Sequence, residues 1–84
     1  MMEQMELPLR EAAVNRIRSY YRTLENHRRT SIALHGHVKP STKALARLLG
    51  SEVSAIGKEY PEDKEIQRWV SKFGEFSNQP DLLE

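Results

Sequence analysis

The sequence predicts an all-α protein, a small helical bundle that contains a helix-turn-helix unit. Apolar residues recur at three- and four-residue spacing along most of the chain, and glycines and prolines fall between these periodic stretches. No run of β-branched residues alternates with polar ones, and no Asn-Gly or Asp-Gly pair signals a hairpin turn. At 84 residues, the chain has room for one compact domain.

The first expected helix covers residues 9–28. Its apolar stripe comprises Ala13 or Val14, Ile17, Tyr20 or Tyr21, and Leu24. Pro8 suits the first turn of a helix, because the N–H that proline lacks has no partner at that position. Residues 1–8 are therefore predicted to form an extended tail.

Two short helical segments are expected next. A turn of helix over 30–35 should stop at Gly36, which favours the left-handed conformation of a helix cap. A helix over 42–49 should follow, with Ser41 as its N-cap and Gly50 as its end. Leu45, Leu48 and Leu49 provide its apolar content.

Two further helices complete the predicted domain, which spans 9–76. One covers 51–60 and stops at Pro61, with Val53, Ile56 and Tyr60 on one face. The last runs from about 62 to 73 and stops near Gly74; its buried residues are expected to be Ile66, Trp69, Val70 and Phe73. Residues 77–84 are predicted to be a flexible tail.

Composition places the chain among soluble globular proteins, since 38% of its residues are hydrophobic and 30% are charged. No apolar run approaches the roughly 20 residues that cross a bilayer, and the first residues do not resemble a secretion signal. The chain has no cysteine, which excludes disulfides and thiolate chemistry. We therefore expect a cytoplasmic protein with no membrane partner.

The net charge of +1 conceals two halves of opposite sign. Residues 1–50 hold nine Lys and Arg against four Glu, a balance of +5. Residues 51–84 hold four Lys and Arg against eight Asp and Glu, a balance of −4. A polyanion such as nucleic acid would suit the basic half and be repelled by the acidic one.

The most informative motif lies in residues 42–56. Ala46 is small enough for a second helix to cross, Gly50 follows four residues later, and Ile56 follows six residues further on as an apolar anchor. This spacing resembles the helix-turn-helix unit of DNA-binding proteins. The segment is similar to that of the lambda Cro-like repressors in its Thr-Lys, Ala, Leu-Gly and Ser-Ala-Ile residues. The resemblance implies a transcriptional regulator or an accessory factor of replication or of a mobile element.

The same resemblance implies that the second helix of the unit enters the major groove of duplex DNA. The side chains expected to read bases are Glu52, Ser54, Ala55, Gly57 and Lys58. Glycine in the exposed interior of a helix is explained if a phosphate backbone approaches it closely. Because one such helix reads only a few base pairs, a homodimer or a second DNA-bound protein is expected. Alternatively, the motif is a helical corner used only for packing.

Basic side chains around the motif and along the first helix are expected to contact phosphates. They are Lys39, Lys43 and Arg47 near the motif, and Arg16, Arg18, Arg22, Arg28 and Arg29 on the first helix. The alternative for the first helix is a solvated face without a ligand.

Both ends of the chain carry peptides that resemble motifs by which bacterial proteins bind the sliding clamp of DNA polymerase. At the N-terminus, Gln4, Met5, Leu7 and Leu9 are similar to the pattern Gln-Leu-x-Leu-x-Leu, and residues 79–83 are similar to a shorter form. The resemblance implies an extended peptide whose leucines enter an apolar cleft. The chain would then be an adaptor for a protein partner. Leu7 and Pro8 also fit a plain helix start.

No residues point to catalysis or to a cofactor. The three histidines, His27, His35 and His37, lack a cysteine or carboxylate at ligand spacing, so contacts with solvent or phosphate explain them better than a metal ion. No glycine-rich phosphate loop, nucleophile elbow or zinc-protease motif occurs. We therefore expect a non-enzymatic, DNA-binding protein without metal.

Overall fold

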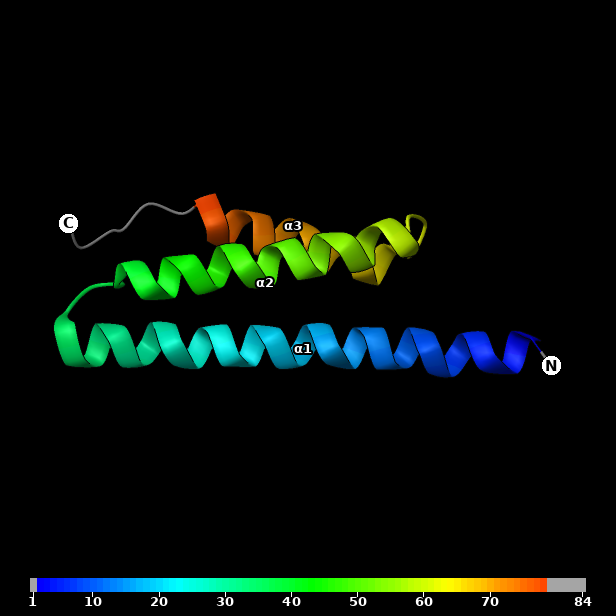
Figure 1. Ribbon diagram of the computed structural model, residues 1–84, viewed down its shortest axis with the longest axis horizontal. Coiled ribbons are helices and arrows are strands. Elements are labelled where there is room, and N and C mark those ends of the chain that lie inside the picture. Colours follow the sequence, from blue (N-terminus) through cyan, green and yellow to red (C-terminus); the bar gives the residue numbers. More distant parts are fainter. Residues whose placement is uncertain (1, 79–84) are drawn as a thin grey trace.

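The computed structural model describes the backbone of residues 2–78 and the side chains of residues 9–75. It contains three helices, α1 (Met2–His35), α2 (Pro40–Glu59) and α3 (Lys64–Asn78), and no strand among the described residues (Figure 1). The all-α fold is thus confirmed. The clamp-like peptide at residues 79–83 lies outside the described residues.

The three helices run up, down and up, and form an elongated body of 52 × 19 × 16 Å. Short connections join successive helices, so α2 packs antiparallel to both α1 and α3. At 34 residues, α1 is much longer than α2, and its N-terminal part projects beyond the other two helices (Figure 1). The α1–α2 connection and the α2–α3 connection therefore lie at opposite ends of the bundle.

The core is built from the apolar stripes that the sequence predicts. Its fully buried members are Ile17, Leu24, Val53, Ile66 and Phe73, with Val14, Ala46, Leu49 and Ile56 around them. Tyr21 packs edge-on against Phe73 at a centroid distance of 6.0 Å, and its ring is tilted against that of Trp69 at 5.3 Å; these contacts join α1 to α3. Leu48 differs from the expected pattern, because it is 60% exposed.

Helix α1 is longer than predicted at both ends. The segment expected to be an extended tail, residues 1–8, is instead helical from Met2 onward, because Met, Glu and Gln are strong helix formers. Pro8 lies inside this helix, where it lacks the N–H that would bond to the carbonyl four residues earlier. At the other end, the helix continues without a break to His35. Gly36 then stops it with a φ of 78°, which confirms the predicted left-handed cap.

Helix α2 runs unbroken through Gly50, so the predicted turn there is wrong and the chain has no helix-turn-helix unit at this place. The reason lies in the phase of the apolar residues. Ala46, Leu49, Val53 and Ile56 follow one another at steps of three, four and three, and all four are buried. One straight helix buries this whole stripe, which offsets the roughly 1 kcal/mol that a helical glycine costs relative to alanine.

The remaining helix ends are set by capping residues and prolines, and they lie within a few residues of their predicted positions. Lys39 rather than Ser41 is the N-cap of α2, and Pro40 occupies the first turn. Helix α2 stops before Pro61, as predicted. Asp63 caps α3, because its Oδ1 accepts the N–H groups of Glu65 and Ile66 at 3.1 and 3.2 Å. Helix α3 also continues past Gly74, where the sequence predicted its end.

Candidate nucleic-acid interface

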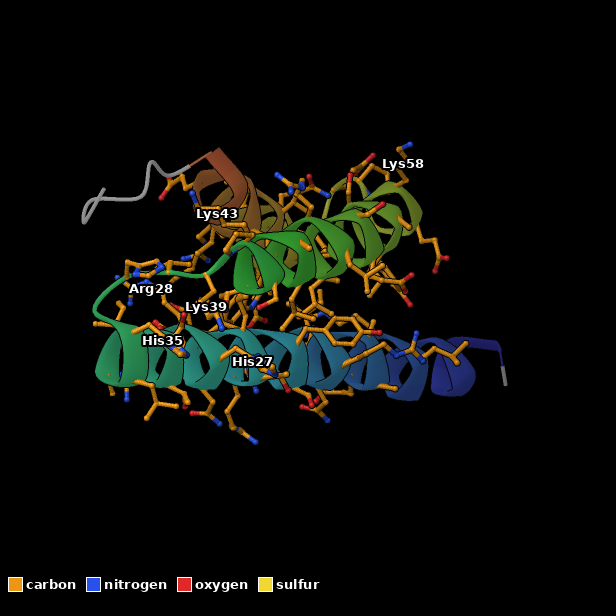
Figure 2. All side chains as sticks on the ribbon, turned by 60° about the vertical axis from the view of Figure 1, so that its left-hand side comes forward. His27, Arg28, His35, Lys39, Lys43 and Lys58 are labelled. Carbon is orange, nitrogen blue, oxygen red and sulfur yellow. The ribbon has the colours of Figure 1, made fainter. Side chains whose placement is uncertain are left out.

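One end of the molecule is strongly basic. Residues 22–47 form the last part of α1, the α1–α2 connection and the first part of α2, and they hold six Lys and Arg against a single Glu. We call this region the basic end. In Figure 2, the labelled His27, Arg28, His35, Lys39 and Lys43 all lie near the α1–α2 connection, whereas Lys58 lies near the other end of α2. The fold therefore places basic residues of two helices at the same end of the bundle.

The opposite end, around the α2–α3 connection, is acidic. Residues 52–65 hold five Asp and Glu against two Lys. Arg10 of α1 reaches this region: its Nε donates to Asp63 Oδ2 at 2.6 Å and its Nη2 to Glu65 Oε1 at 2.8 Å. Arg18 donates to the other oxygen of Glu65 at 3.0 Å. The charge asymmetry of the sequence thus becomes an asymmetry along the long axis of the molecule.

A buried serine holds the α1–α2 connection in shape. Ser31 is only 6% exposed; its Oγ donates to the carbonyl of His37 and accepts the N–H of Lys39, both at 2.9 Å. His37 Nδ1 lies 3.0 Å from the carbonyl of His35. Since a carbonyl only accepts, this nitrogen carries the proton, and Nε2 faces away from that bond. These contacts give the backbone before α2 a defined path.

The predicted phosphate-binding residues fall into two groups. Arg16, Arg22, Arg29, Lys39 and Arg47 are exposed, and no ion pair to a described residue is seen for them. Arg18 is held by Glu65, and Arg28 lies 3.5 Å from Glu25 on its own helix. Lys43 is half-buried. The structure thus places most of the exposed cations at the basic end, with Arg16 farther back along α1.

Exposed side chains that can donate a hydrogen bond to a phosphate lie on more than one side of α1. Arg22 and Arg29 are seven residues apart, which places them on the same face of the helix. His27 is five residues from Arg22, about 140° away around the helix axis. It lines a shallow pocket of about 420 Å³ between the end of α1 and the start of α2. The pocket is lined by Asn26, His27, Thr30, Ser31, Leu34, His35, Lys39, Ser41 and Thr42.

Four of the five residues predicted to read bases, Glu52, Ser54, Ala55 and Lys58, are exposed, and they span an arc of about 160° around the continuous helix. Gly57 is buried, which corrects the expectation that it faces solvent and a phosphate backbone. A Cβ at this position would lie 2.6 Å from Cγ2 of Val70. The close neighbour of Gly57 is therefore α3.

The backbone of the N-terminal peptide also differs from the predicted conformation. Gln4, Met5, Leu7 and Leu9 all lie in α1, whereas the clamp-binding resemblance requires an extended segment. Leu9 is 60% exposed. The sliding clamp and a homodimer stay predictions, since no contact in the structure tests them.

Several contacts and surfaces of the molecule could not be predicted from the sequence. The Arg10–Asp63 contact joins residues 53 positions apart, and the pocket depends on how α1 and α2 meet. Thr42, which lines the pocket, has the sequence context of an ordinary first-turn residue. The three histidines were visible as possible phosphate contacts, and two of them, His27 and His35, line the pocket.

The described residues contain no group of three His, Asp or Glu side chains placed to hold a metal ion. No described helix combines the length and the apolar character needed to span a bilayer. Comparisons with protein-family models, with curated proteins and with solved structures give no match for this chain. The charge distribution and the pocket are therefore the features of the molecule that point to a function.

Proposed function

We propose that this protein binds duplex DNA through its basic end, mainly by contacts with the phosphate backbone. The observation that carries the proposal is the excess of six Lys and Arg over one Glu in residues 22–47, which form the last part of α1, the α1–α2 connection and the first part of α2. Most non-specific binding energy in protein–DNA complexes comes from such contacts, because each neutralised phosphate releases counterions. The acidic end would face away from the DNA.

The proposed mode differs from the one that the helix-turn-helix resemblance implies. Helix α2 is continuous through Gly50, and Gly57, one of the expected base-reading residues, is buried, so no short recognition helix follows a turn at this place. Contacts from Arg22, Arg29 and Lys39 to phosphates would position the protein without reading sequence. We therefore expect weak sequence preference and strong salt dependence.

The test is fluorescence anisotropy of the protein with a labelled duplex of mixed sequence, measured across a series of salt concentrations. The Arg22→Gln/Arg29→Gln double variant removes two exposed cations at the basic end. Each phosphate contact contributes about −0.9 to the slope of log K against log salt concentration, so this variant should lower the magnitude of that slope by about 2.

The matched control is Lys58→Gln/Arg68→Gln, which makes the same change in net charge with two exposed residues outside the basic end. It should keep the wild-type slope. Equal losses in both double variants would show that only net charge matters, and an absence of binding at low salt would overturn the proposal.

A further inference from the structure

We infer that the pocket between the end of α1 and the start of α2 is a binding site for a phosphate group. The inference deepens the proposed function, and rests on it for the idea that nucleic acid is the source of the phosphate. The pocket has a volume of about 420 Å³, which accommodates a phosphate together with its attached group or water. Three independent features of its lining favour an oxyanion.

The first feature is the N-terminus of α2, a helix of 20 residues whose first turn has no acidic side chain. Pro40 has no N–H, the N–H of Lys39 donates to Ser31, and those of Thr42 and Lys43 donate to the carbonyl of Lys39 at 3.0 and 3.2 Å. Ser41, which lines the pocket, therefore has the N–H that remains for a ligand. The first turn contains no acidic residue to neutralise the positive end of the helix dipole.

The second feature is Thr42, a polar residue that is 4% exposed and lines the pocket. No hydrogen bond from its hydroxyl to a described residue is seen, and the oxygen is open to the pocket, since Glu25 Oε1 alone is a fully enclosed side-chain polar atom without a partner among the described residues. A hydroxyl that opens onto a pocket is available to donate a hydrogen bond to a ligand. Ser31, the other buried polar side chain of the pocket, already has two partners. A phosphate oxygen would give the Thr42 hydroxyl the acceptor that it lacks.

The third feature is the set of donors around the opening. His27, His35 and Lys39 line the pocket, and Figure 2 shows all three near the α1–α2 connection. The lysine carries a positive charge, and an imidazole has an N–H donor in its neutral as well as its charged form. No Asp or Glu is among the lining residues. The wall of the pocket thus offers hydrogen-bond donors from both helices and no repelling charge.

The binding test uses inorganic phosphate as the probe, at constant ionic strength, with the amide resonances of Ser41 and Thr42 followed by NMR. Saturable shifts at these amides are expected. Thr42→Val removes the hydroxyl with little change in shape, and should weaken phosphate binding by at least about tenfold, because a hydrogen bond to a charged group is lost. Thr42→Ser keeps the hydroxyl and should retain binding.

The outcomes separate this inference from the proposed function. If phosphate causes no saturable shifts, or if Thr42→Val binds it as tightly as the wild type, the phosphate site is wrong; DNA binding that depends on Arg22 and Arg29 would still stand. Should the valine variant lose its fold, loss of the phosphate-induced shifts in Lys39→Gln supports the site, and unchanged shifts overturn it. If phosphate binds to the pocket but duplex DNA does not bind to the protein, the proposed function is wrong and the phosphate site still stands.

A second arm identifies the source of the phosphate. Two labelled duplexes of equal sequence, one with a 5′-phosphate and one with a 5′-hydroxyl, are compared in the anisotropy assay. Tighter binding of the phosphorylated duplex, lost in Thr42→Val, would assign the pocket to a terminal phosphomonoester. Equal binding of the two duplexes, weakened by Thr42→Val, would assign it to the phosphodiester backbone. No effect of Thr42→Val on either duplex would exclude nucleic acid as the source.

Discussion

Gly57 shows how strongly one residue depends on its surroundings. In the sequence it is a glycine inside an expected helix, and close approach of a ligand would explain it. In the structure the approaching group is Val70 of α3. Gln67 also donates its Nε2 amide to the carbonyls of Gly57 and Tyr60 at 2.9 and 3.0 Å. The missing side chain therefore permits the contact between α2 and α3.

We expect Gly57→Ala to destabilise the protein. Alanine favours a helix by about 1 kcal/mol, but the new Cβ would lie 2.6 Å from Cγ2 of Val70, and a β-branched side chain has little freedom to move aside. Overpacking of this kind costs about 1–3 kcal/mol. The free energy of unfolding in urea measures the net effect.

The control for this substitution is the Gly57→Ala/Val70→Ala double variant, which removes the clashing methyl groups. The two changes should be less harmful together than the sum of the single changes. A Gly57→Ala protein as stable as the wild type would contradict the tight contact.

At the scale of the helix, Gly36 and Gly74 have different roles although both were expected to end helices. Gly36 has a φ of 78° and ends α1, whereas Gly74 lies within α3. A Cβ at either position would meet nothing within 4 Å. Only the backbone conformation distinguishes them.

This pair yields opposite predictions for the same substitution. Gly36→Ala should destabilise the protein by about 1–2 kcal/mol, because L-residues are strained in the left-handed conformation. Gly74→Ala should stabilise it by up to about 1 kcal/mol through higher helix propensity. Thermal and urea unfolding of the two variants check both signs. Stabilisation by Gly36→Ala would show that α1 does not end in a left-handed cap.

In the assembled bundle, the Arg10 contacts hold α1 to the α2–α3 connection. Arg10 is 29% exposed and Asp63 is 18% exposed, so the pair is partly shielded from solvent. The pKa of the Asp63 carboxyl is lowered from its ordinary value of 3.8 to about 2, mainly because the carboxylate accepts hydrogen bonds from Arg10. The same guanidinium lowers the pKa of Glu65.

Stability should therefore fall in acid. Because the folded state lowers the pKa of Asp63, its contribution is fully present above about pH 4, and is lost as the pH falls through 3.8 toward about 2. Asp63→Asn keeps a good N-cap but removes the charge. It should be less stable than the wild type at pH 7, and the difference should shrink toward pH 2. Urea unfolding at several pH values measures this; a constant difference would contradict the role of the ion pair.

The sequence alone was sufficient for the fold class and for much of the core. Apolar periodicity identifies Ile17, Leu24, Val53, Ile66 and Phe73, all fully buried. The left-handed Gly36 and the end of α2 before Pro61 were also predictable, because both depend on backbone preferences of single residues. The concentration of positive charge in the first half of the chain is likewise a property of composition.

The tertiary structure decided which glycines interrupt a helix and which residues become neighbours. Gly50 matched a turn motif, yet one straight helix buries a continuous apolar stripe on both sides of it. Gly57, Arg10 and Thr42 acquire their surroundings only when α1 and α3 pack against α2. Local patterns describe what a residue favours by itself. Burial and contacts between distant residues depend on how the helices pack, and here packing outweighed the local preference.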